Sequence, residues 1–307
     1  MQKLILLAGL CAIIADTCLA AQNLACVYQS TSDQIGANPF DILRDIDSQL
    51  CSQIIYSSLK PAPVSLSSYE KRKFQAFADL KQSNEELQTF LEVDLSTAGS
   101  QIFIPQNREI FIASVIEHLV AGNFDGLNIK WAAESNSSRP DIKQDFSSLI
   151  ETLSGRLGQR QLSLSVSAAE SDIDRSYDIS ALSNDVDFFY VMSFDVDQSS
   201  DDPAVFRNAR AAMERFHLDG VPKEKLLMGI ASYGYGAEQA IIPRYEQSNY
   251  SPEEVYFDSP ETIEHKANFS SEYGGVIVKA LNLDDFNGMG DDGNYPVIQR
   301  LHDKILE

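Results

Sequence analysis

Residues 124–134 read Phe-Asp-Gly-Leu-Asn-Ile-Lys-Trp-Ala-Ala-Glu, and the polar and apolar side chains of this stretch alternate as they do along a β-strand. Alternation separates the central residues into an outer set, Leu127, Ile129 and Trp131, and an inner set, Asn128, Lys130 and Ala132. A strand buried in a parallel sheet is normally apolar on both faces. The polar inner set therefore marks a functional site or the remains of one.

Seven other short apolar segments accompany this one, with amphipathic helical patterns between them. The predicted strands are 25–29, 53–57, 89–95, 126–131, 161–168, 188–193, 226–231 and 276–281. The clearest predicted helices are 108–121 with Gly122 at C′, about 141–157, and one that starts at Pro203 after an Asp202 N-cap. Eight strands alternating with helices predict an α/β fold, the (β/α)8 TIM barrel. A doubly wound open sheet is the alternative, although no GxGxxG turn follows the first strand.

The composition excludes several classes of function. The chain has 307 residues, and 24 Lys and Arg against 45 Asp and Glu give a net charge of −21. Such a chain repels nucleic-acid phosphates and anionic lipid head groups, so no nucleic-acid partner is expected. With 44% hydrophobic and 22% charged residues it is a folded globular protein. Its length admits two domains or one large barrel, and no linker marks a boundary.

Residues 1–20 have the pattern of a secretory signal peptide. Lys3 supplies a basic start, residues 4–14 are apolar but too few to span a bilayer, and the small residues Cys18 and Ala20 precede a predicted cleavage point. A buried N-terminal helix is the alternative. We expect residues 21–307 to form one barrel domain that is secreted and extracellular, with no membrane span.

The cysteine and histidine pattern favours a disulfide over a metal site. Removal of the signal peptide leaves Cys26 and Cys51, which most simply form one disulfide in an oxidising compartment. The four His are scattered, without HExxH or CxxC motifs, so we expect neither metal nor cofactor. Three N-x-[ST] sequons, at Asn136, Asn249 and Asn268, predict a glycoprotein.

Six segments resemble, in order and spacing, the chitinases and chitinase-like proteins of glycoside hydrolase family 18. They are the first strand with its disulfide partner (26–28 and 46–51), the second strand (54–56), the fourth (124–134), the approach to the MxYD strand (177–195), the seventh (221–234) and the eighth with its exit (274–286). The resemblance covers nearly all of the mature chain and implies a TIM barrel.

The fourth strand of that family carries DGxDxDxE, whose Glu protonates the glycosidic oxygen while the substrate's own N-acetyl group attacks. Asp125 and Gly126 match the opening of the motif. Asn128 replaces the first interior Asp, Lys130 the second, and Ala132 the catalytic Glu. The resemblance therefore implies a chitinase-like protein that lacks the family's general acid.

Glu134 does not replace this acid in our interpretation. It lies two residues beyond Ala132 on the same face, about 6.6 Å along an extended chain, whereas proton transfer needs hydrogen-bond reach of the leaving oxygen.

The sugar-binding positions implied by the resemblance are also altered. Asp195 is retained, but Phe194 lacks the hydroxyl of the family's Tyr, and Lys279 stands where the family has a stacking Trp. Tyr233, after the seventh strand, is a further candidate binding residue. The single Trp, Trp131, is predicted to point outward.

Charged residues are predicted inside the barrel. Glu92 and Asp94 stand on the third strand where the family has small residues, and Lys130 and Lys279 add positive charge. Because unpaired buried charges are costly, we predict that at least one of these lysines lies within ion-pair distance of Asp195, Glu92 or Asp94. The alternative is that these charges simply reach solvent.

The chain is also shorter than typical family members. Only about 40 residues separate Gly234 from Gly274, where the family inserts an α+β domain, so that domain is expected to be largely absent. Residues 255–258 and a helix from about Ser259 resemble the family's return to the barrel.

Two function classes follow. The first is a secreted, catalytically inactive chitinase-like protein, acting as a lectin-like, growth-factor-like or matrix-associated factor with a carbohydrate or an extracellular protein as partner. The second is a weak glycosidase that uses Asp195 with an unrecognised acid on N-acetylglucosamine polymers. A structural or storage glycoprotein is a third alternative.

Overall fold

The computed structural model describes residues 22–32, 39–59, 66–96, 99–135, 139–195, 203–237, 240–290 and 292–306. The predicted signal peptide, Asn136 and Asp202 lie outside the described residues, as does the side chain of Asp195. Cys26, Cys51, Asn249 and Asn268 lie within them.

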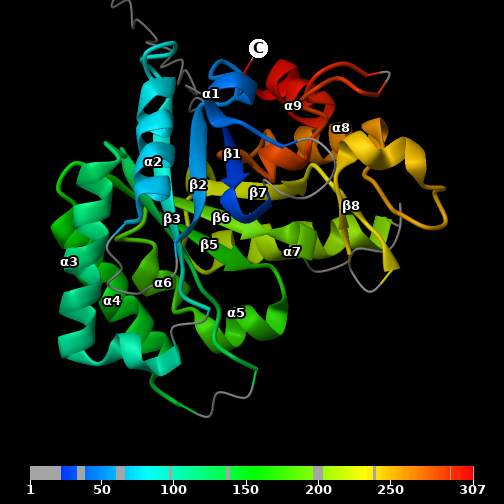
Figure 1. Cartoon of the computed structure of the whole chain (residues 1–307). Coiled ribbons are helices and arrows are strands. Elements are labelled where there is room, and N and C mark those ends of the chain that lie inside the picture. The colour runs from blue at the N-terminus through cyan, green and yellow to red at the C-terminus, as the bar shows by residue number, and fades with distance from the viewer. Residues whose placement is uncertain are drawn as a thin grey trace, which may run out of the picture.

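Eight parallel strands close into a barrel, which confirms the predicted (β/α)8 fold (Figure 1). Their order around the barrel is β1-β10-β7-β6-β5-β4-β3-β2, so the first strand pairs with the last. The bounds are β1 Asn23–Gln29, β2 Gln53–Leu59, β3 Gln88–Asp94, β4 Gly126–Lys130, β5 Gln161–Ser167, β6 Phe188–Met192, β7 Leu226–Ala231 and β10 Gly275–Lys279. Each lies within three residues of its predicted start and end.

Helices cover the outside of the barrel, with α3 and α4 side by side on one flank (Figure 1). Their bounds are α1 Ile42–Asp45, α2 Ser68–Leu80, α3 Pro105–Ala121, α4 Ile142–Leu157, α5 Glu170–Ser176, α6 Ile179–Leu182, α7 Pro203–Leu218, α8 Pro260–Ser270 and α9 Pro296–Ile305. None of the helices in the described part of the chain is both long and apolar enough to cross a membrane.

The predicted alternation along β4 is confirmed. Leu127, Ile129 and Trp131 belong to the large apolar cluster between the barrel and its helices. Trp131 stacks on Phe146 of α4, with ring centroids 4.3 Å apart. Asn128 faces the interior and is fully buried.

The end of α3 differs from the prediction. Gly122 is the C-cap with φ −98°, and the left-handed residue is Asn123 with φ 49°. A Cβ on Gly122 would lie 2.2 Å from the ring of Phe124. Glycine is therefore required for close packing against Phe124, and a short polar side chain tolerates the left-handed turn.

A short excursion replaces the family's inserted domain between β7 and α8. It contains the two-residue strands β8 (Gly234–Tyr235) and β9 (Ile241–Ile242), which pair in antiparallel fashion, and the 3-10 helix Arg244–Asn249. Tyr235 also bridges to Tyr256 before the chain enters α8. The excursion projects to the right of the barrel in Figure 1.

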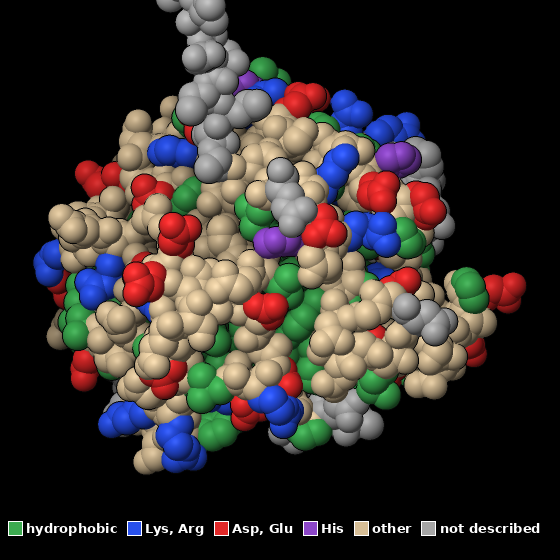
Figure 2. Space-filling view, turned by 90° about the horizontal axis from the view of Figure 1, so that it is seen from above, with side chains coloured by type: hydrophobic (Ala, Val, Ile, Leu, Met, Phe, Trp, Pro, Cys, Tyr) green, Lys and Arg blue, Asp and Glu red, His purple; other side chains and the backbone are tan. Residues whose placement is uncertain are grey.

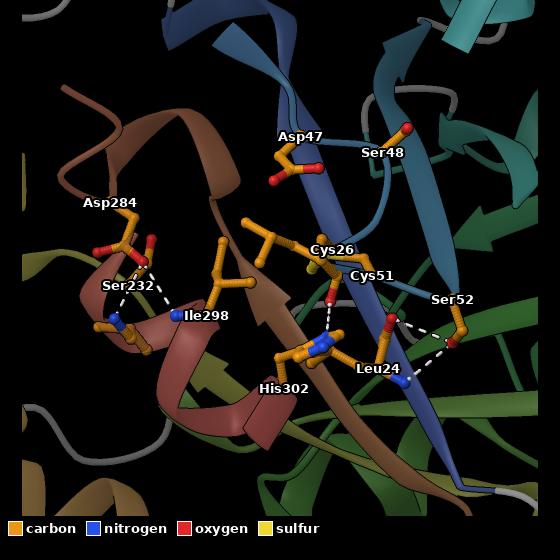
Figure 3. The surroundings of a disulfide bond; sticks show 12 residues. Leu24, Cys26, Asp47, Ser48, Cys51, Ser52, Ser232, Asp284, Ile298 and His302 are labelled. Atoms are coloured by element: carbon orange, nitrogen blue, oxygen red, sulfur yellow. Dashed lines mark hydrogen bonds between the residues drawn. A yellow bond between two sulfur atoms is a disulfide. The ribbon is translucent and has the colours of Figure 1, made fainter. Parts of the chain in front are cut away.

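The predicted disulfide is present and lies beside the C-terminal helix. Cys26 of β1 is bonded to Cys51 before β2, and both are buried (Figure 3). His302 of α9 contacts the carbonyl oxygen of Leu50 through Nδ1 at 2.9 Å. The hydroxyl of Tyr295 donates to the carbonyl of Asp45. These two contacts join α9 and the residue before it to the loop that the disulfide closes.

Candidate functional site

The mouth of the barrel, at the C-terminal ends of β3 and β4, holds an ion pair. Asp94 and Lys130 are register partners on these strands, and Lys130 Nζ lies 3.3 Å from Asp94 Oδ2. This contact confirms the predicted pairing of an interior lysine. The side chains are 33% and 28% exposed, so the pair sits at the partly solvated mouth rather than deep inside.

The carboxyl group of Asp94 is tuned by competing influences. Burial raises its pKa, but a hydrogen bond from the Ser96 hydroxyl and the charge of Lys130 outweigh burial, and the pKa lies below its ordinary value. Asp94 is therefore a stable carboxylate at neutral pH and is not a proton donor.

Glu92 lies one layer deeper and has neutral partners instead of a lysine. Its carboxylate accepts hydrogen bonds from the Ser57 hydroxyl at 2.6 Å, from Asn128 Nδ2 at 2.7 Å and from the Ser165 hydroxyl at 3.4 Å. Asn128 Nδ2 also donates to Ser165 Oγ at 2.8 Å, and Asn128 Oδ1 accepts from the Ser163 hydroxyl at 3.1 Å. Both amide hydrogens and the amide oxygen of Asn128 are thereby used.

Asp125 and Gly126 lie at the opposite end of β4 from the mouth. Asp125 Oδ2 accepts from the backbone N–H of Thr89 at 2.8 Å and pairs with Lys81 Nζ at 2.5 Å. A Cβ on Gly126 would lie 2.2 Å from the ring of Phe90. These two family-like residues therefore join β3 to β4 and permit close packing, and they do not take part in the mouth.

The chain just beyond β4 is held from outside. The Ser176 hydroxyl accepts from the backbone N–H of Ala133 at 2.9 Å, and the Tyr177 hydroxyl donates to the carbonyl of Trp131. Ala132 is half-buried between them and brings only a methyl group, whereas Glu134 is exposed beyond the strand.

Two of the predicted binding residues lie together but beneath other side chains. Phe194 is 7% and Tyr233 4% exposed, both in the apolar interior cluster. The Tyr235 hydroxyl lies 3.4 Å from that of Tyr233 and from the carbonyl oxygen of Phe194. The cavity beside them measures only about 20 Å³, enough for a water molecule but not for a sugar ring.

Lys279 and Asp195 complete the predicted set. Lys279 is half-buried at the end of β10, and its carbonyl accepts from the backbone N–H of Ser232 at 2.7 Å. The backbone of Asp195 ends the 3-10 turn that follows β6. No group of three His, Cys, Asp or Glu among the described residues is placed to hold a metal ion.

Two features of the interior were not anticipated from the sequence. Ser163 and Ser165 of β5 face inward and complete the polar layer around Asn128. Their signal was visible, since Gln161–Ser167 alternates polar and apolar residues as β4 does. The buried pair of Arg244 and Asp284, 3.9 Å apart, joins the first residue of the 3-10 helix Arg244–Asn249 to a residue that follows β10, and such a contact leaves no periodic signal.

A family model described as Glycosyl hydrolases family 18 matches residues 23–284. The chain belongs to this family. It is similar to chitotriosidase-1 of Mus musculus, with 24% identity over 85% of this chain and 73% of that relative. It is 27% identical to the oviduct-specific glycoprotein of Sus scrofa, over 100% of this chain and 73% of that relative. It is 26% identical to chitinase-3-like protein 2 of Homo sapiens, over 92% of both.

Solved structures of family 18 proteins share the fold. The Group IV chitinase of Ostrinia furnacalis has a TM-score of 0.82 at 22% identity, covering 93% of this chain and 100% of that one. Human YKL-39 has a TM-score of 0.81 at 22% identity, covering 94% and 100%. YKL-39 is described as a pseudo-chitinase with retained chitooligosaccharide binding properties.

Proposed function

We propose that this family 18 protein is a secreted chitinase-like protein that does not hydrolyse chitin and acts by binding a carbohydrate or an extracellular protein. The observation that carries the proposal is that the polar side chains at the mouth, and in the layer just below it, are paired with one another. Asp94 is paired with Lys130, and Glu92 is hydrogen-bonded by Asn128.

The chemistry of the inner face supports inactivity. Glycoside cleavage needs a protonated acid within hydrogen-bond reach of the leaving oxygen. The three inward residues of the β4 region are an amide, an ammonium already paired with a carboxylate, and a methyl group: Asn128, Lys130 and Ala132. Asp94, the carboxylate paired with Lys130, has a lowered pKa and therefore makes a poor acid.

The relatives support a binding role. Chitinase-3-like protein 2 and the oviduct-specific glycoprotein align over nearly the whole chain, and YKL-39 combines the same fold with retained chitooligosaccharide binding. We infer that the mouth of this barrel contacts sugar through the exposed parts of Lys130 and the half-buried Lys279.

Secretion is supported by the chemistry of the cysteines and sequons. Disulfides persist in oxidising compartments, and the buried bond between Cys26 and Cys51 fits such a compartment. The sequon residues Asn249 and Asn268 are both exposed, as a glycosylation acceptor must be. Expression in cultured eukaryotic cells tests this: the protein should reach the medium, begin near residue 21, and lose mass on treatment with an N-glycosidase.

A turnover assay tests inactivity. Chitotetraose is incubated with the protein, with mouse chitotriosidase-1 as the parallel sample, and products are followed by mass spectrometry. We expect no cleavage by this protein. Hydrolysis that is lost in Asp195→Ala would contradict the proposal and establish the weak glycosidase that forms the alternative.

A further inference from the structure

A second cavity lies outside the barrel, where the excursion after β7 meets the beginnings of α8 and α9. It has a volume of about 290 Å³, and none of its lining residues belongs to a barrel strand. The part of its wall that matters here consists of Arg244, Tyr250, Phe257, Asp258, Asp292 and Arg300. This cavity is therefore separate from the mouth that contains Lys130 and Asp94.

Arg244 is fixed in the wall of this cavity. Its side chain is only 9% exposed and lies over the ring of Phe257 at 5.2 Å. Its guanidinium donates to the carbonyl oxygens of Ser232 at 3.1 Å and Asp258 at 3.2 Å, and to Gln247 Oε1 at 3.3 Å. These bonds hold the guanidinium in the wall of the cavity, and Asp284 Oδ1 lies 3.9 Å from its Nε.

Each charged side chain of the wall has a counter-charge. Arg244 lies 3.9 Å from Asp284 and is also acted on by the charge of Asp292, and Arg300 Nη1 lies 3.0 Å from Glu264 Oε1. Asp258 is neutralised by Lys266 at 2.5 Å. An anion would meet the carboxylates and a cation would meet the guanidinium groups, so neither is favoured.

The helix ends at the cavity do not alter this balance. In α8 the backbone N–H of Thr262 already donates to Ser259 Oγ at 3.2 Å. In α9 the N–H groups of Val297 and Ile298 donate to Asp284 Oδ2 at 3.2 and 3.1 Å (Figure 3). Donors that would otherwise attract an anion to helix N-termini are therefore occupied.

Hydroxyl groups suit such a wall because each is both donor and acceptor. They can accept from Arg244 and donate to the carboxylate of Asp292. Tyr250, whose side chain is 37% exposed, and Phe257 add aromatic surface for the C–H face of a ring. The volume lies near the lower end of ligand pockets, which hold about 300–1,000 Å³, and suits a single ring rather than an extended chain.

We propose that this cavity binds one neutral pyranose residue, such as the terminal sugar of a glycan, independently of the barrel mouth. The site goes beyond the function proposed above, because it contains neither Lys130 nor Lys279 and stands whether or not the mouth binds sugar; Asp258 separates it from the small cavity beside Phe194 and Tyr233.

Saturation-transfer NMR on the intact glycoprotein tests the proposal. The probes are methyl β-D-glucopyranoside, methyl β-D-galactopyranoside and methyl α-D-mannopyranoside, with D-glucuronate and sulfate as charged comparisons. We expect at least one neutral probe to bind and both charged probes to bind more weakly. Tyr250→Ala should raise the dissociation constant about fivefold or more, which corresponds to the loss of about 1 kcal/mol of aromatic contact.

Matched variants separate this site from others. Tyr69→Ala removes another exposed tyrosine, on α2, which is 55% exposed against 37% for Tyr250, and should leave the dissociation constant unchanged. Asn249→Gln removes the sequon beside Tyr250 and should retain binding. The proposal is overturned if no neutral probe binds at 50 mM, if Tyr250→Ala binds as the parent does, if glucuronate or sulfate binds more tightly, or if Asn249→Gln abolishes binding.

Discussion

Glu92 and Asn128 show how a carboxylate is accommodated inside the barrel without a cation. Glu92 is 2% exposed and accepts hydrogen bonds from three neutral donors. One of them, Asn128, is itself hydrogen-bonded to two serines of β5. A buried carboxylate is costly unless each oxygen is hydrogen-bonded. The stability of this layer should therefore depend on the amide of Asn128.

Asn128→Asp places a second carboxyl group 2.7 Å from Glu92, at the position of the present amide nitrogen. Two carboxylates at this distance cannot both ionise, so we expect the variant to be less stable at pH 7.5 by about 2–4 kcal/mol and to recover part of this loss at pH 5, where they share a proton. Urea unfolding at both pH values measures the effect. Gln106→Glu, which adds a carboxylate at an exposed position of α3, should show neither change.

The pair of Asp94 and Lys130 should contribute little to stability, since both side chains are about a third exposed. Lys130→Met is expected to change the free energy of unfolding by less than about 1 kcal/mol. Loss of the ammonium should still move the pKa of Asp94 upward, which a ¹³C NMR titration of its carboxyl carbon would report. Below that pKa the parent loses the small stabilisation of the pair. An unchanged titration would show that Lys130 does not act on Asp94.

At the scale of elements, Asp284 connects the exit of β10 to the start of α9. It is fully buried, accepts from the N–H groups of Val297 and Ile298, and lies 3.9 Å from Arg244. Burial raises its pKa from 3.8 to about 6, against the opposing charge of Arg244. The cap is thus provided by a carboxyl group that binds a proton more readily in the folded chain than in the unfolded one.

Because the pKa of Asp284 is higher in the folded chain than in the unfolded chain, its contribution to the free energy of unfolding is largest below pH 4 and becomes smaller as the pH rises through 6. Relative to Asp284→Asn, which does not titrate, the parent should lose about 3 kcal/mol between pH 4 and pH 7, from a pKa rise of 3.8 to about 6 at 1.36 kcal/mol per unit. Urea unfolding of both proteins across this range measures the difference. Parallel pH profiles would contradict the prediction.

The disulfide joins β1 to the start of β2 across a separation of 25 residues. Cys26→Ala combined with Cys51→Ala should lower the free energy of unfolding by about 3–4 kcal/mol in the chain-entropy description. Cys26 and Cys51 are 0% and 1% exposed, so mild reductant should act slowly on the folded parent. Unfolding midpoints that match those of the parent would show that packing of α9 alone holds this region.

Periodicity and capping residues in the sequence predicted most of the helices and strands. Side-chain contacts across the barrel were harder to predict. Alternation in β4 placed Asn128 and Lys130 inward, and adjacent parallel strands made Asp94 a natural partner of Lys130. Glu92 is a register partner of Ser57 and Asn128 in the same way, whereas its contact with Ser165 joins β3 to β5 and depends on the stagger of the strands, which periodicity does not encode. Arg244 lies near Asp284 because the excursion after β7 folds back toward the exit of β10, and no local sequence pattern predicts that contact.

At the scale of the whole molecule, one face shows how the acidic excess is arranged. Asp and Glu side chains are interspersed with Lys and Arg over the face seen in Figure 2, without a broad patch of one sign. A net charge of −21 nevertheless produces self-repulsion in the compact state. This repulsion lowers the free energy of unfolding, and screening the charges should raise it.

Raising NaCl from 10 to 300 mM should increase the melting temperature by a few degrees, because salt screens surface charges beyond about 10 Å at 0.1 M. Thermal unfolding followed by circular dichroism measures this. The same increase in KCl, as the control, should act equally. A melting temperature that falls with either salt would mean that attractive ion pairs outweigh the excess of acid.

Closure of the barrel by β10 against β1 has a consequence for how the chain is made. Asn23 of β1 pairs with Gly275 of β10. Some 250 residues must therefore be synthesised after β1 before β10 can pair with it. During that interval β2 and the bond between Cys26 and Cys51 are already available to β1. In the nascent chain the disulfide loop can thus keep β1 beside β2 and limit its pairing with other strands until β10 has been synthesised.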